Sequence, residues 1–174
     1  MQRFNLLIST YRNRENDCVS ELWYLFREIG DDQAEAQKTR ISGLVTVKTK
    51  LDPFEAVRKL EAMAKERPWD FRYVLKLTPI EVVVPTSLEE ISKAASELAE
   101  RKIPIDESFR VTVNKRATAL RTHDIIEAIA SRISRKVDLT NPDRVVQVEV
   151  LADVTGISVL KPEEVVSIVK LLGR

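Results

Sequence analysis

The sequence has few of the residues on which common catalytic and metal sites depend. Its 174 residues include one Cys and one His, and its four glycines lie far apart, at Gly30, Gly43, Gly156 and Gly173. One Cys cannot form an intramolecular disulfide, and one Cys with one His supplies too few ligands for an ordinary zinc site. Isolated glycines cannot form the loop that wraps a phosphate in P-loop or Rossmann proteins. We therefore expect neither a metal nor a cofactor.

Long apolar runs are also missing. No stretch approaches the roughly 20 apolar residues that cross a bilayer, and the opening Met-Gln-Arg-Phe leads into no signal-peptide core, so we expect a cytoplasmic protein with no membrane partner. Asn (5) and Gln (4) are scarce while 32% of residues are charged, a bias typical of thermophile proteins. The net charge is only +1. Nucleic-acid binding would therefore need a local basic patch.

Apolar periodicity in the first half predicts the order β-α-β-β-α-β. Strands are expected over residues 3–9, 34–39, 44–48 and 71–84, the last one interrupted at Pro79. The first helix is expected to start at an Asn13 cap and to stop at Gly30, and the second to run from an Asp52 cap to about Arg67. This order is the ferredoxin-like plan, which gives a first domain over residues 1–85.

The second half, residues 86–174, reads as a further α/β domain. Ser87 and Glu90 have capping-box spacing, and they predict a helix that ends near Lys102. We expect strands over 109–114, 146–150 and 157–160, a helix over 122–136, and a last helix that starts at Pro162. Because no Gly/Ser-rich linker joins the halves, we expect an α+β protein with two subdomains packed together.

One segment stands out by charge. Between residues 110 and 136 there are seven cations and two anions, so the segment carries +5 in a chain whose total is +1. Placed on a helix over 122–136, its arginines flank the apolar stripe that Ile125, Ile129 and Ile133 form. Such a flank, beside the free N–H groups of a helix start near Thr122, suits a phosphate backbone. The candidate RNA-binding residues are Arg110, Lys115, Arg116, Arg121, Thr122, His123, Arg132, Arg135 and Lys136. The alternative is a solvated face on a charge-rich protein.

Two potentially reactive side chains are interpreted as non-catalytic. Cys18 shares a helical face with Leu22 and Leu25, which predicts a buried structural thiol. His123 and Asp124 are adjacent at a helix start, so their side chains point about 100° apart and cannot form an oriented acid-base pair. We expect His123 to lie at the mouth of the basic segment, where it could hydrogen-bond or stack on a nucleotide.

The basic segment also carries a family resemblance. The stretch Phe-Arg-Val-Thr-Val-Asn-Lys-Arg (109–116), followed by a helix, by Val-Asp-Leu-Thr-Asn-Pro-Asp (137–143) and by Val-Gln-Val-Glu-Val (146–150), resembles the THUMP domain of RNA-modifying proteins. The resemblance covers roughly residues 86–160, and THUMP proteins also carry a ferredoxin-like module before that domain. The opening Phe-Asn-Leu-Leu-Ile-Ser-Thr-Tyr (4–11) is most similar to the stand-alone subgroup, which includes the eukaryotic adaptor for tRNA cytidine N4-acetylation.

This resemblance implies an archaeal adaptor that binds tRNA at the acceptor stem and 3′ end. It also implies a separate enzyme, such as a tRNA cytidine acetyltransferase, because the two expected domains leave no catalytic domain in the sequence. Two other hypotheses stay open. One is an RNA-modifying enzyme that uses His123 with a distant carboxylate, and the other is a ferredoxin-like regulatory or oligomeric module without RNA binding.

Overall fold

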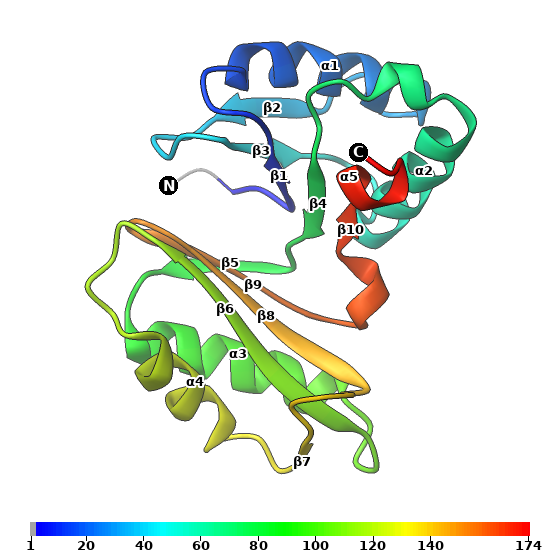
Figure 1. Cartoon of the computed structure of the whole chain (residues 1–174). Helices are drawn as coiled ribbons and strands as arrows, with labels where there is room; N and C mark the ends of the chain where they lie inside the picture. Colours follow the sequence, from blue (N-terminus) through cyan, green and yellow to red (C-terminus); the bar gives the residue numbers. More distant parts are fainter. Residues whose placement is uncertain (1–2) are drawn as a thin grey trace. The chain divides into compact units, whose positions relative to one another are not determined.

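The computed structural model describes residues 3–174 and divides the chain into two compact units. Within the described residues, unit 1 comprises residues 3–80 and 163–174, and unit 2 comprises residues 81–162 (Figure 1). Each unit has one five-stranded sheet and its own cluster of buried apolar side chains. The chain is therefore a mixed α/β protein, as the sequence predicts. Within the described residues, no helix has the length and apolarity that a membrane span requires.

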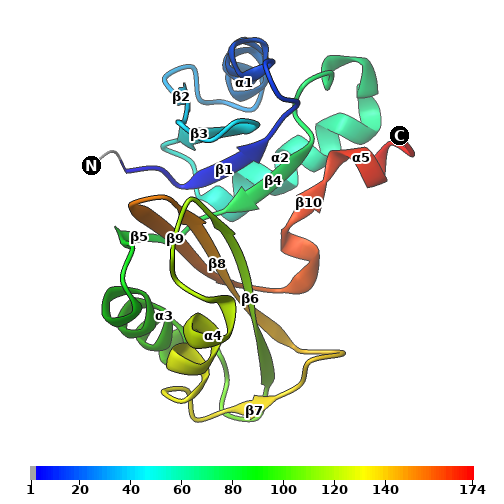
Figure 2. The same cartoon turned by 60° about the vertical axis from the view of Figure 1, so that its left-hand side comes forward.

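Unit 1 has the ferredoxin-like topology. Its strands are β1 (Leu6–Ser9), β2 (Glu35–Lys38), β3 (Leu44–Lys48), β4 (Lys76–Pro79) and β10 (Val166–Ser167), and they lie in the order β10-β4-β1-β3-β2. Every pairing is antiparallel. The helices α1 (Glu15–Glu28) and α2 (Pro53–Glu66) cover one face and supply much of the apolar core (Figure 2). The first four strands and two helices confirm the β-α-β-β-α-β prediction.

Local signals set most helix ends of unit 1. The Asp52 carboxylate accepts hydrogen bonds from the N–H groups of Phe54 and Glu55, so the predicted cap of α2 is confirmed. Gly30 has a φ of +106° and ends α1 as predicted. The predicted Asn13 cap is wrong, because Asn13 itself adopts a φ of +66° and α1 starts after Arg14. The short 3-10 helix η1 (Pro68–Asp70) follows α2.

Unit 2 has its helices on one face of a mixed sheet. The strands are β5 (Val82–Pro85), β6 (Ser108–Arg116), β7 (Lys136–Val137), β8 (Arg144–Leu151) and β9 (Val154–Leu160), in the order β5-β9-β8-β6-β7. Strand β6 runs parallel to both β7 and β8. The helices α3 (Leu88–Lys102) and α4 (Thr122–Ala130) lie along the same face of this sheet (Figure 2). As predicted, the Ser87 hydroxyl caps α3 through the Glu90 N–H.

The boundary between the units differs from the expected division into residues 1–85 and 86–174. Val82 to Pro85 pair with β9, so this strand belongs to unit 2. At the other end, residues 163–174 belong to unit 1, because β10 pairs with β4 and Ile168 is buried in that core. The physical reason is strand pairing between residues far apart in sequence, on which local patterns carry no information.

Two predicted helices differ from those of the structure. The helix expected over 122–136 ends at Ala130, because the chain turns there and Lys136 of β7 then pairs with Ser108 of β6. The helix expected from Pro162 is instead a 3-10 turn, η2 (Pro162–Glu164), then β10 and the four-residue helix α5 (Ile168–Leu171). In both cases the segment pairs with an edge strand of a sheet, and this pairing overrides its helical propensity.

Candidate nucleic-acid interface

Strand β6 distributes the predicted basic residues between the two faces of its sheet. Phe109 and Val111 point into the core under α3 and α4, and strand alternation places Lys115 on that same side. Arg110 and Arg116 therefore point to the opposite face. The end of β6 leads through residues 117–121 into α4, and the Lys115 ammonium donates a hydrogen bond to the Leu120 carbonyl at 2.9 Å. Lys115 thus lies beside the start of α4.

Four of the predicted residues, Lys115, Arg121, Thr122 and His123, lie at the start of α4, and we call them the β6–α4 corner. Arg121 is 80% exposed, and its Nε lies 2.9 Å from Asp124 Oδ2. His123 is 84% exposed, and its Nε2 lies 3.0 Å from Glu127 Oε2. The Arg121 side chain makes no capping bond to the first turn. The corner therefore offers exposed cations next to a helix start whose N–H groups favour an anion.

Three of the predicted arginines are instead matched by carboxylates within unit 2. Arg116 lies 2.8 Å from Glu149, and Arg132 lies 3.1 Å from Glu89. Arg135 has a side chain only 7% exposed, and it bonds the Ile103 carbonyl at 2.9 Å as well as Glu100 at 3.1 Å. Because α4 stops at Ala130, Arg132 and Arg135 do not continue a basic helical flank. Their contacts connect the segment after α4 to α3.

Sequence reasoning missed the acidic partner of Arg116. Glu149 is 2% exposed and accepts hydrogen bonds from Asn114 at 2.8 Å, from Arg116 at 2.8 Å and from Gln147 at 2.6 Å. The parallel register aligns Asn114 with Glu149. The alternation of Gln147 and Glu149 in β8 could have placed them on one face, but no sequence signal gives the register against β6. Arg116 therefore neutralises a buried carboxylate.

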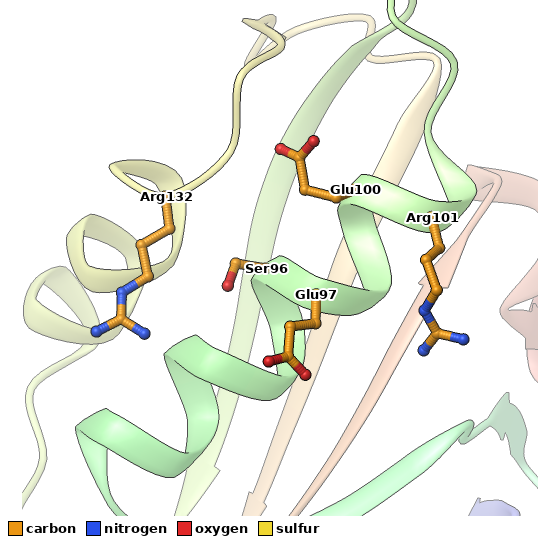
Figure 3. Close-up of a pocket in the computed structure, with 5 residues that line it drawn as sticks. All are labelled: Ser96, Glu97, Glu100, Arg101 and Arg132. Atoms are coloured by element: carbon orange, nitrogen blue, oxygen red, sulfur yellow. The ribbon is translucent and has the colours of Figure 1, made fainter.

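A cavity of about 420 Å³ adjoins Arg132 on the helix side of unit 2. Its lining is Ser96, Glu97, Glu100, Arg101 and Arg132. Figure 3 shows that four of these side chains come from α3 and that Arg132 comes from the turn after α4. Two carboxylates in this lining repel phosphate. They balance the charges of Arg101 and Arg132, so the cavity has no net positive charge that would attract an anion.

Arg110 and Lys136 lie toward the other end of β6. Arg110 donates to the Leu139 carbonyl at 3.2 Å, and Lys136 stands opposite Ser108 on β7. Neither forms an ion pair with any residue between 3 and 174. A nine-residue strand is roughly 25 Å long, so these two cations are separate from the corner. The nine predicted residues thus form a corner, a set of internal pairs and a distant basic end.

The comparisons with known proteins define the class of unit 2. Residues 85–160 match the family model of the THUMP domain, a range that runs from the end of β5 to β9. The chain therefore contains a THUMP domain, which confirms the resemblance seen in the sequence.

Particular relatives extend the similarity to unit 1. The chain is 27% identical over 156 residues to THUMP domain-containing protein 1 of Mus musculus, a match that covers 79% of this chain and 45% of that protein. The crystal structure of PH1313 from Pyrococcus horikoshii has a TM-score of 0.68 at 21% identity, covering 90% of this chain and 55% of that one. A 4-thiouridine synthetase in complex with RNA and ATP has a TM-score of 0.53 at 16% identity, covering 92% and 42%. The chain thus spans about half the length of these relatives.

Proposed function

We propose that this protein binds tRNA through the β6–α4 corner and presents it to a separate modification enzyme. The THUMP domain is associated with tRNA binding and modification, and one solved structure with the same fold is described as an RNA complex. The observation that carries the proposal is the corner itself. Within the THUMP domain, it places Lys115 and Arg121 beside the first turn of a nine-residue helix.

The chemistry of the corner suits recognition of RNA shape. Double-stranded RNA is held mainly through phosphates and 2′-hydroxyls, which require cations and N–H donors rather than a base code. The Arg121–Asp124 pair is exposed, so a phosphate can replace the carboxylate at little cost. His123 adds a ring that can hydrogen-bond or stack. The acceptor stem presents the phosphates and 2′-hydroxyls, and its unpaired 3′ end presents bases that can stack.

We propose in addition that the chain is an adaptor without catalytic activity. His123 of the corner forms with the neighbouring Glu127 a pair that resembles a catalytic dyad, but the two side chains are 84% and 70% exposed. A general base works best when a buried partner fixes its orientation and water is excluded, and this pair has neither feature. The resemblance of residues 4–11 to the stand-alone THUMP subgroup supports a separate enzyme, and a tRNA cytidine acetyltransferase is the partner we propose.

Affinity for tRNA tests the binding proposal. The double variant Lys115→Ala/Arg121→Ala should bind tRNA at least about tenfold more weakly and lower the slope of log K against log salt by roughly 1.4 to 1.8. The matched control is Lys93→Ala/Arg101→Ala, which removes two exposed cations of α3 in the same unit. If both double variants lose the same tRNA affinity, the corner is not the binding site. Wild-type protein that binds no tRNA at low salt would favour the regulatory or oligomeric alternative.

Nucleoside analysis tests the absence of catalysis. The purified chain, incubated with tRNA and with acetyl-CoA plus ATP or with S-adenosylmethionine, should leave every nucleoside unchanged by mass spectrometry. A new modified nucleoside that disappears in the His123→Ala variant would overturn the adaptor proposal in favour of the enzyme.

A further inference from the structure

Unit 1 carries a second cluster of exposed cations, at the end of its sheet where two loops meet. The first loop connects β1 to α1 over residues 10–14, and the second is the β2–β3 turn over residues 39–43 (Figure 1). Together with the flanking positions they present one exposed aromatic ring and four cations, which we call the loop cluster: Tyr11, Arg12, Arg14, Lys38 and Arg40.

The two loops are joined by specific hydrogen bonds. The Thr10 N–H donates to the Gly43 carbonyl at 2.9 Å, and the Gly43 N–H donates to Glu15 Oε2 at 2.7 Å. Gly43 has a φ of +81°, and a Cβ there would lie 3.1 Å from the Thr10 carbonyl oxygen. A side chain at this position would therefore be strained both by the positive φ and by the close approach of the two loops. The cations of both loops are consequently held on one surface of unit 1.

Two of the four cations in the loop cluster, Arg12 and Arg40, are available to a ligand. Arg14 lies 3.4 Å from Asp17 in an exposed pair, whereas Arg12 and Arg40 form no ion pair with any described residue. Glu15, the first residue of α1, accepts a hydrogen bond from the Gly43 N–H group and interacts electrostatically with Lys38. Tyr11 is 50% exposed, so part of its ring is accessible to a ligand. An exposed ring beside two arginines that form no ion pair within the described residues suits a ligand with a flat apolar face and negative charge.

We propose that the loop cluster is a second RNA-binding site, which holds an unpaired nucleotide of the same RNA. A base can stack on the Tyr11 ring, while Arg12 and Arg40 contact the flanking phosphates. Bases inside a duplex are already stacked, so the ring selects an unpaired one. The inference rests on the proposed RNA-binding function for the nature of the ligand. It adds a site in unit 1, outside the basic segment that the sequence singles out.

Binding of two short RNAs to the intact chain tests this site. The probes are a 12-nucleotide oligouridylate and a blunt 12-base-pair RNA duplex. Tyr11→Ala should weaken oligouridylate binding at least about fivefold and duplex binding less than twofold, because stacking on a ring requires a free base. Tyr11→Phe should retain wild-type affinity. Arg12→Ala/Arg40→Ala should weaken oligouridylate binding and lower its salt slope by roughly 1.4.

The control Arg58→Ala/Lys59→Ala removes two exposed cations of α2 in the same unit and should change neither probe by more than twofold. If Tyr11→Ala binds oligouridylate as tightly as this control does, the stacking site is wrong. It is also wrong if Tyr11→Ala loses the same affinity for oligouridylate and for the duplex. If wild-type protein binds tRNA and only the β6–α4 corner variant reduces binding, the second site is wrong while the proposed function stands. Wild-type protein that binds none of the three RNAs contradicts the proposed function itself.

Discussion

At the residue scale, Glu149 organises the polar side chains of unit 2. Its carboxylate accepts hydrogen bonds from Asn114, Arg116 and Gln147. Removing it leaves a guanidinium and two amides without their acceptor, which is costly for groups shielded from water. We expect Glu149→Ala to lower the free energy of unfolding by ~2–4 kcal/mol in chemical denaturation. Glu97→Ala, which removes an exposed carboxylate of α3, should change it by less than ~0.5 kcal/mol. Similar losses for both variants would contradict this role.

A second residue-scale prediction concerns Glu15 and pH. The Gly43 N–H stabilises the ionised carboxylate and holds the pKa of Glu15 below its ordinary value. A carboxyl whose pKa is lowered by folding stabilises the native state above its unfolded pKa of about 4.3, and this contribution is lost as the pH falls through the lower, folded pKa. Wild-type protein should therefore melt at a higher temperature than Glu15→Gln at pH 7, and the gap should narrow below about pH 4. A gap that stays constant from pH 7 to pH 3 would refute the assignment.

At the element scale, the sequence predicts those features that depend on neighbours in the chain. The caps at Asp52 and Ser87 fix the starts of α2 and α3 within a few residues of local sequence, and both were predictable. The end of α4 was not, because β7 forms by pairing with β6 across 28 residues. Ile133 kept its apolar position in the pattern and is buried, although it lies beyond the helix. The apolar periodicity therefore predicted the burial of Ile133 correctly and its helical backbone conformation wrongly.

The contrast between neighbours in the chain and residues far apart in it also explains how much of the candidate site could be predicted. Lys115, Arg121 and His123 are brought together by adjacent loop and helix residues, so the basic segment predicted their proximity. The ion pairs of Arg116 and Arg132 join elements 33 and 43 residues apart. Charge counting cannot detect such partners, and it therefore overestimated the exposed charge. Tyr11 and Arg40 escaped notice because two separate loops bring them to one surface.

Arg135 allows an element-scale prediction that separates structure from RNA binding. Its guanidinium bonds the Ile103 carbonyl and Glu100, and it thereby connects the segment after α4 to the end of α3. Arg135→Ala should lower the free energy of unfolding by ~1–3 kcal/mol, because a buried carbonyl and a carboxylate lose their donor. The salt slope of tRNA binding by the folded variant should stay at the wild-type value. A stable variant with a slope lowered by about one unit would make Arg135 a phosphate ligand after all.

At the scale of the whole molecule, unit 2 is inserted between β4 and β10 of unit 1. A fragment over residues 86–174 would therefore omit β5 and carry β10 without its partner strand. The fragment over residues 81–162 keeps all five strands of the second sheet, and its range nearly coincides with the THUMP match. We expect the 81–162 fragment to fold cooperatively and the 86–174 fragment to unfold at a lower temperature. The opposite order in circular-dichroism melts would contradict the insertion.

Removal of residues 163–174 should destabilise unit 1. Val166 and Ile168 are 5% and 1% exposed and belong to its apolar core. Burial of each side chain contributes ~1.5–3 kcal/mol, so the shortened chain should lose about 3 kcal/mol or more in the transition of unit 1. The variant Ile168→Ala should reproduce part of this loss. Lys170→Ala, at an exposed position of the same short helix, should not. If the truncated chain keeps the wild-type stability of unit 1, the first four strands of that unit suffice for its stability and this prediction is wrong.

The most direct measurement of the central claim is amide hydrogen exchange of the intact chain with and without saturating tRNA. Phosphates held at the β6–α4 corner engage the loop after β6 and the first turn of α4, so amides of residues 115–124 should exchange more slowly in the complex. Peptides over α2, residues 53–66, serve as the internal reference and should exchange at the same rate in both states. Unchanged exchange over residues 115–124 in a saturated complex, with protection confined to other segments, would contradict the account.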